Sequence, residues 1–80
     1  MPLFYFHRRN TPQRASDRRC EFRDIGEALA EANRMARTIL ARTSDPAGLA
    51  RDALDIENEG RAVVARVMFA DVIRQTGAAR

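Results

Sequence analysis

The sequence predicts an α+β fold, a two-layer sandwich in which one long helix covers one face of a four-stranded antiparallel sheet. Two short segments with alternating apolar residues open the chain, a long segment with helical spacing follows, and two more alternating segments come after it. Strands that lie close together in a sequence pair as antiparallel hairpins. The order ββαββ, with a short last helix expected at residues 70–75, therefore predicts this sandwich.

The opening of the chain predicts a hairpin of two strands, residues 3–8 and 19–23, joined by a turn at Asn-Thr-Pro. In the first strand Phe4 and Phe6 share the face that we assign to the core. By the same alternation, Cys20 lies on the core face of the second strand. The first hairpin therefore presents an aromatic inner face and a mixed outer face.

A helix is predicted to begin after Asp24 and to end before Pro46. The Asp24 carboxylate can cap the first turn, and Glu27 completes a pair that resembles a capping box. Glu27, Glu31 and Arg34 share the opposite, solvated face, where we expect salt bridges and not an acid–base pair. The apolar positions recur at spacings of three and four residues: Ile25, Ala28, Leu29, Ala32, Met35, Ala36, Ile39 and Leu40.

The last part of the chain predicts a second hairpin, with strands at residues 54–57 and 63–69. Its turn ends at Gly60, which is suited to a positive φ. We expect Val63 on the core face of the last strand. The acids of the hairpin are expected on its solvated face: Asp55, Glu57 and Glu59.

The expected core between the sheet and the helix follows from these face assignments. It consists of Phe4, Phe6, Phe22, Leu29, Ala32, Ala36, Ile39, Ile56, Val67 and Phe69. One helix covers one face only, so the other face is expected to be wet or covered by another molecule. This candidate partner-facing surface consists of Tyr5, His7, Val64, Arg66 and Met68.

All fourteen basic residues are arginine, and they are unevenly distributed. Residues 1–23 carry six arginines against two acids, whereas the rest carries eight against nine. This asymmetry favours an anionic partner. An arginine- and alanine-rich composition is also what a GC-rich genome produces without selection for such a partner. The candidate anion or nucleic-acid site is the first hairpin: Arg8, Arg9, Arg14, Arg18 and Arg19.

Eighty residues predict one small domain, residues 1–80, with a core that a second subunit often stabilises. No apolar run approaches the roughly 20 residues of a membrane span, and none resembles a signal peptide, so no membrane partner is expected. A single cysteine, Cys20, makes no internal disulfide and favours a reducing, cytoplasmic setting.

The sequence favours a protein that is not an enzyme. His7 and Cys20 could form a nucleophile–base pair, but alternation places them on opposite faces of the sheet. One histidine and one cysteine do not supply the three or four ligands of a metal site, so no metal is expected. No phosphate-binding glycine loop is present, and no cofactor is expected.

Three motifs together resemble a family of short bacterial proteins of unknown function: MPLFYFH at residues 1–7, DIGEALAEA at 24–32 and IENEGRAVVARVMFADVI at 56–73. Its members open with Met-Pro-x-aromatic-aromatic-Phe-His, continue with an Asp-Leu-x-x-Ala helix and close with a hairpin and a Pro-Phe-type segment. The resemblance implies a small α+β domain and no established activity.

The chain departs from the family pattern at four positions. An apolar residue, an acid, a glycine and a proline are usual, in this order, at Arg8, Arg18, Arg19 and Met68. The first three departures make the first hairpin unusually basic, so the resemblance implies no charge-based role for the family as a whole.

Two functional hypotheses remain open from the sequence. The first is a non-catalytic interaction or structural module that self-associates, with a dimer as the expected state. The alternative is a regulatory protein that binds nucleic acid, with the Arg-rich first hairpin along the phosphates and with Tyr5 and His7 stacked on unpaired bases.

Overall fold

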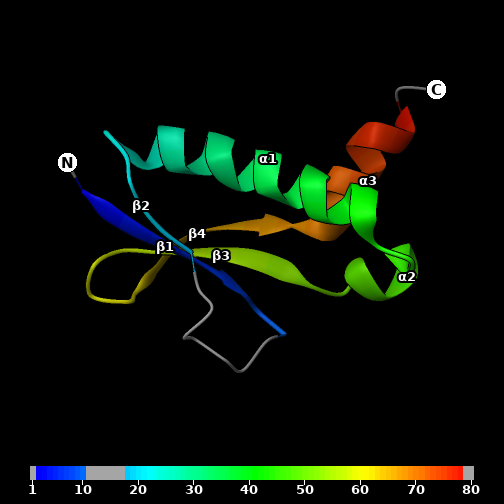
Figure 1. Cartoon of the computed structure of the whole chain (residues 1–80), viewed down its shortest axis with the longest axis horizontal. Coiled ribbons are helices and arrows are strands. Elements are labelled where there is room, and N and C mark those ends of the chain that lie inside the picture. The colour runs from blue at the N-terminus through cyan, green and yellow to red at the C-terminus, as the bar shows by residue number, and fades with distance from the viewer. Residues whose placement is uncertain (1, 11–17, 79–80) are drawn as a thin grey trace.

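The computed structural model confirms the α+β sandwich (Figure 1). The structure describes residues 2–10 and 18–78, with side chains described as far as Gln75. The expected turn and loop at residues 11–17 and the arginine Arg14 lie outside the described residues. The elements are β1 (Leu3–Arg8), β2 (Arg18–Glu21), α1 (Ile25–Arg42), α2 (Pro46–Leu49), β3 (Ala53–Glu57), β4 (Val63–Met68) and α3 (Phe69–Ala78).

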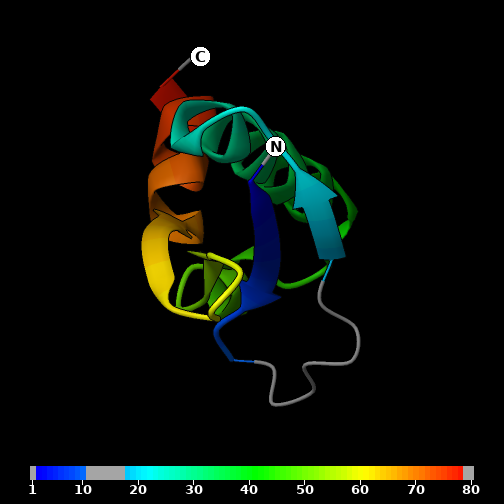
Figure 2. The same ribbon diagram turned by 90° about the vertical axis from the view of Figure 1, so that its left-hand side faces the viewer.

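The four strands form one antiparallel sheet in the order β2-β1-β3-β4. The two hairpins therefore join through the pairing of β1 with β3, and β2 and β4 are the edge strands. Figure 2 shows α1 and α3 on the same side of this sheet. Within residues 2–10 and 18–78, these two helices thus do not cover the opposite side of the sheet.

Helix α1 begins at a residue whose side chain caps its first turn. The Oδ1 of Asp24 accepts a hydrogen bond from the Glu27 amide at 2.9 Å, which confirms the predicted cap. Glu27 in turn accepts from the amide of Arg23 at 2.7 Å, one residue before the cap, so the reciprocal bond is shifted from the usual capping box. The apolar stripe that contacts the sheet is made of small residues: Ala28, Ala32 and Ala36.

The core lies between the sheet and the helices, as predicted. Phe4, Phe6, Ile56, Val67 and Phe69 are buried, and helix α3 adds Val72. Three further predicted core residues are partly buried against this cluster: Phe22, Leu29 and Ile39. The small alanines of α1 allow the helix to approach the sheet closely, so the phenylalanines of β1 fill the space between the layers.

The second hairpin differs from the sequence prediction in two features, the residue with a positive φ and the direction of Val63. The loop closes between Asn58 and Ala62, and the residue with positive φ is Arg61 (φ 67°), not Gly60. A three-residue hairpin loop places its left-handed residue last, which explains the difference. Val63 is 48% exposed instead of inward, because a bulge leaves Val64 without a partner in the register and shifts the alternation.

Two smaller differences concern the connections. The segment before β3 contains the one-turn helix α2, in which Leu49 is buried against the core. The last helix begins at Phe69, which was expected to end the strand. Phe69 still points into the core, because it lies at the junction of the two elements. In the described part of the chain, no helix is long and apolar enough to cross a membrane.

Candidate functional site

The acids of β3 are buried, which corrects the expectation that they are solvated. Asp55 is 6% exposed and Glu57 is 1% exposed. β3 is an inner strand, so the side chains of Asp55 and Glu57 are flanked by side chains of β1 on one side and of β4 on the other. Each carboxylate has an arginine partner: Nε of Arg66 lies 2.5 Å from Asp55, and Nε of Arg61 lies 2.8 Å from Glu57.

The outward residues of β1 lie beside these acids. His7 is directly opposite Asp55 in the β1–β3 register, and Tyr5 is opposite Glu57. The guanidinium of Arg61 lies 4.0 Å from the centroid of the Tyr5 ring. His7 is only 6% exposed, so within a single copy of the chain it does not lie on a wet surface.

The predicted partner-facing surface is therefore divided in two. Tyr5 is partly buried and lies against the guanidinium of Arg61, and His7 is buried. Val64 and Met68, by contrast, are 45% and 36% exposed on the edge strand β4. Whether a partner contacts any of these residues stays a prediction.

The predicted anion site is also divided. Arg8 pairs with Asp52 at 3.0 Å, and Arg18 pairs with Glu31 at 3.1 Å. The raised pKa of Arg66, which its hydrogen bond to Asp55 causes, shows the same kind of internal neutralisation. The exposed candidates that form no ion pair with another described residue are Arg9 and Arg19.

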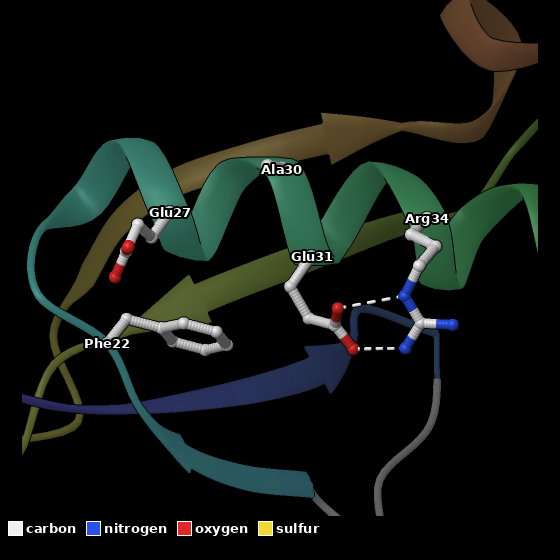
Figure 3. Close-up of a pocket in the computed structure, with 5 residues that line it drawn as sticks. All are labelled: Phe22, Glu27, Ala30, Glu31 and Arg34. Atoms are coloured by element: carbon white, nitrogen blue, oxygen red, sulfur yellow. Dashed lines mark hydrogen bonds and ion pairs between the residues drawn. The ribbon is translucent and has the colours of Figure 1, made fainter.

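A first recess lies between α1 and the end of β2 (Figure 3). It has a volume of about 360 Å³ and is lined by Phe22, Glu27, Ala30, Glu31 and Arg34. Arg34 donates two hydrogen bonds to Glu31, and these bonds lower the pKa of that carboxyl. The expected salt bridge on this face is confirmed, and its charges neutralise one another within the recess.

A second recess lies where β1, α1 and α2 end and β3 begins. Its volume is about 300 Å³, and its lining is mostly polar: Arg8, Asn10, Thr43, Asp45, Gly48, Leu49 and Asp52. The buried Asp52 holds this corner together, because its Oδ1 accepts hydrogen bonds from the amides of Asn10 (3.0 Å) and Ala53 (2.7 Å). Sequence reasoning missed Asp52, since an isolated acid in a connection carries no motif.

Catalytic and metal chemistry find little support among the described residues. Cys20 packs against the core, on the face of the sheet opposite His7, as the alternation predicted. No group of three His, Cys, Asp or Glu side chains that could hold a metal ion occurs in residues 2–10 and 18–75. The absence of an enzymatic activity remains a prediction.

Comparison with known proteins places the chain in a family but gives no activity. No curated protein matches the sequence. No solved structure matches it either. The model of a domain of unknown function, DUF6894, matches residues 3–70. Since the match covers most of the chain and all four strands, the protein belongs to the DUF6894 family.

Proposed function

We propose that the protein is a non-catalytic association module that binds a second copy of itself through the outer edge of β4. The observation that carries this proposal is the exposure of Val63, Val64 and Met68 on an edge strand. An edge strand presents unpaired main-chain N–H and C=O groups that pair with another strand. β4 can pair with β4 of a second copy in antiparallel fashion, since a two-fold axis makes such an edge self-complementary.

The two edges of the sheet differ in the way that this proposal requires. β2 is four residues long, and the side chains of Arg18, Arg19 and Glu21 are exposed along it. Charged side chains on a short strand are the usual protection against edge-to-edge pairing. β4 is six residues long, and Arg66 is its only charged residue. Figure 2 shows β4 at the margin of the sheet, with the helices to one side of it.

Arg66 does not protect β4 as an edge arginine usually would. Its guanidinium lies against Asp55 of the neighbouring strand, so its charge is neutralised within the sheet. The bulge at Val64 interrupts the regular part of the edge, which then runs from Ala65 to Met68. We place the contact between the two copies on this regular part, with Met68 at one end and Val64 directly before the other.

Light scattering after size exclusion tests the proposal. The wild type is expected to have twice the chain mass of 9.0 kDa. Val64→Lys and Met68→Lys each add a charge at the contact, and each is expected to shift the mass toward that of one chain. Ile25→Lys is the matched control, because Ile25 is 38% exposed on α1 and lies outside the contact.

A wild type that stays monomeric at about 1 mM, where even a weak pair would form, overturns the proposal. A dimer that neither β4 variant weakens also overturns it, because the contact then lies elsewhere. Nucleic-acid binding by the first hairpin is less favoured, because Arg8 and Arg18 already hold carboxylates of the same chain.

A further inference from the structure

The second recess, which is lined mostly by polar residues, contains charged side chains that take no part in the proposed contact at β4. We call it the polar recess. On one wall, Arg8 is held in place by a buried carboxylate. Its Nε and Nη2 lie 3.1 and 3.0 Å from Oδ2 of Asp52, whose side chain is only 4% exposed. The guanidinium also lies 5.8 Å from the centroid of the Phe69 ring. Arg8 is therefore oriented before any ligand arrives.

One edge of the Arg8 guanidinium is left for a ligand. The Nε–Nη2 edge is occupied by Asp52, whereas Nη1 makes no hydrogen bond to another residue that the structure describes. The end of a guanidinium formed by Nη1 and Nη2 matches the two oxygens of a carboxylate. Arg8 lines the recess, and 43% of its side chain is exposed.

The other wall of the recess is negative. Oδ1 of Asp45 accepts a hydrogen bond from the Gly48 amide at 3.1 Å, and the Asp45 amide donates to Oγ1 of Thr43 at 3.1 Å. These bonds fix the carboxylate as the cap of α2, two residues after the C-cap Thr43 of α1, and the last carbonyls of that 18-residue helix carry partial negative charge. This wall favours a cation or a donor of hydrogen bonds.

We propose that this recess binds a small zwitterion, with its carboxylate on the free end of Arg8 and its ammonium group on Asp45. Neither wall alone selects such a ligand. A simple anion meets the charge of Asp45, and a simple cation leaves the N–H groups at the end of Arg8 without an acceptor, so a molecule with both charged groups uses both walls. The volume of about 300 Å³ accommodates a free amino acid and its side chain.

The test is an NMR titration that follows the backbone amides of Asn10 and Gly48. These amides donate to Asp52 and Asp45, so they report on the two walls separately. The probes are glycine, β-alanine, γ-aminobutyrate and leucine, which vary the spacing of the charges and the bulk. Acetate and ethylamine serve as half-ligands. At least one zwitterion is expected to shift both amides and to bind about tenfold more tightly than either half-ligand.

Two variants assign the charges. Asp45→Asn keeps an oxygen for the Gly48 amide but removes the charge, and Arg8→Lys keeps a cation for Asp52 but removes the planar end. Each is expected to weaken zwitterion binding about tenfold. Asp71→Asn and Arg74→Lys alter an exposed ion pair on α3 and are expected to change nothing.

Three results would overturn the proposal. One is that no zwitterion in the panel shifts the two amides. Another is that acetate binds as tightly as the best zwitterion. The third is that Asp45→Asn leaves the affinity unchanged, and this variant decides the matter if Arg8→Lys proves unfolded by circular dichroism.

Discussion

The two faces of the sheet are buried in different ways. On the face toward α1 and α3, aromatic and aliphatic side chains such as Phe6 and Ile56 meet a stripe of alanines. None of the helices that the structure describes lies over the opposite face, yet His7, Asp55 and Glu57 are each at most 6% exposed. On this face the long side chains of Arg61 and Arg66 pair with the two acids.

This difference shows how a small chain can cover a sheet with one layer of helices. A guanidinium on a long apolar stem pairs with an acid at its tip and shields the strand beneath with its stem. The acids on the face opposite the helices can thus be shielded from water without a second apolar layer. The cost is that the buried acid Asp55 relies on an arginine side chain that is 40% exposed, whereas the apolar core is shared among many contacts.

The largest loss of stability is expected from a substitution on the apolar face of the sheet, which packs against α1 and α3. Phe6 is 3% exposed and contacts the Phe22 ring at a centroid distance of 5.8 Å. Phe6→Ala is therefore expected to lower the free energy of unfolding by about 3–5 kcal/mol, measured by urea denaturation. Ile25→Ala, at an exposed apolar residue of α1, is the control and is expected to have a much smaller effect. An equal effect of the two variants would contradict the core assignment.

The apolar face was predictable from the sequence because periodicity reports which residues share a face. Alternation in β1 and three- and four-residue spacing in α1 assigned Phe4, Phe6 and Ala32 to the core, and all three are buried there. Alternation says nothing about insertions. The bulge that turns Val63 outward depends on the length of the hairpin loop, which sequence reasoning misjudged at Gly60.

The charged face was not predictable, since polar residues are expected to be solvated by default. Burial of Asp55 and Glu57 depends on the strand order, which places β3 between β1 and β4. That order follows from the pairing of β1 with β3, a contact between distant parts of the chain. The polar recess is equally non-local, because Arg8 and Asp52 are 44 residues apart.

A second prediction concerns the charged face, which is the face of the sheet that carries Asp55 and Glu57. Here we expect a loss of stability of intermediate size. Arg66→Met leaves the carboxylate of Asp55 buried without its cation, and an unpaired buried charge of this kind costs about 1–3 kcal/mol of unfolding free energy. Asp55→Asn instead leaves the guanidinium of Arg66 without its carboxylate partner. The side chain of Arg66 is 40% exposed, so its charge can turn into water. We therefore expect the arginine variant to be the less stable of the two in urea denaturation.

The double variant provides the control for this pair. Once Arg66 is replaced by methionine, the further change Asp55→Asn removes the unpaired charge and is expected to recover part of the lost stability. Two single effects that simply add would show that the ion pair does not couple the two residues. The charged face would then be held by packing of the arginine stems alone.

The smallest effect is expected at an exposed pair, which sharpens the contrast with the buried one. Hydrogen bonds from Arg34 lower the pKa of Glu31 below its usual 4.5, so Glu31 contributes stability above pH 4.5 that is lost as the pH falls through the lowered value. Arg34 is 57% exposed, and solvent screening limits the contribution to less than about 1 kcal/mol. Glu31→Gln is therefore expected to lower stability slightly at pH 7 and to match the wild type at acid pH, in thermal unfolding measured across this range.

The control for this prediction is Glu59→Gln. Glu59 is an exposed acid of the hairpin loop, and the variant is expected to match the wild type in stability at every pH. A difference between Glu31→Gln and the wild type that persists at low pH would show that Glu31 acts through packing beside Phe22 and not through its charge.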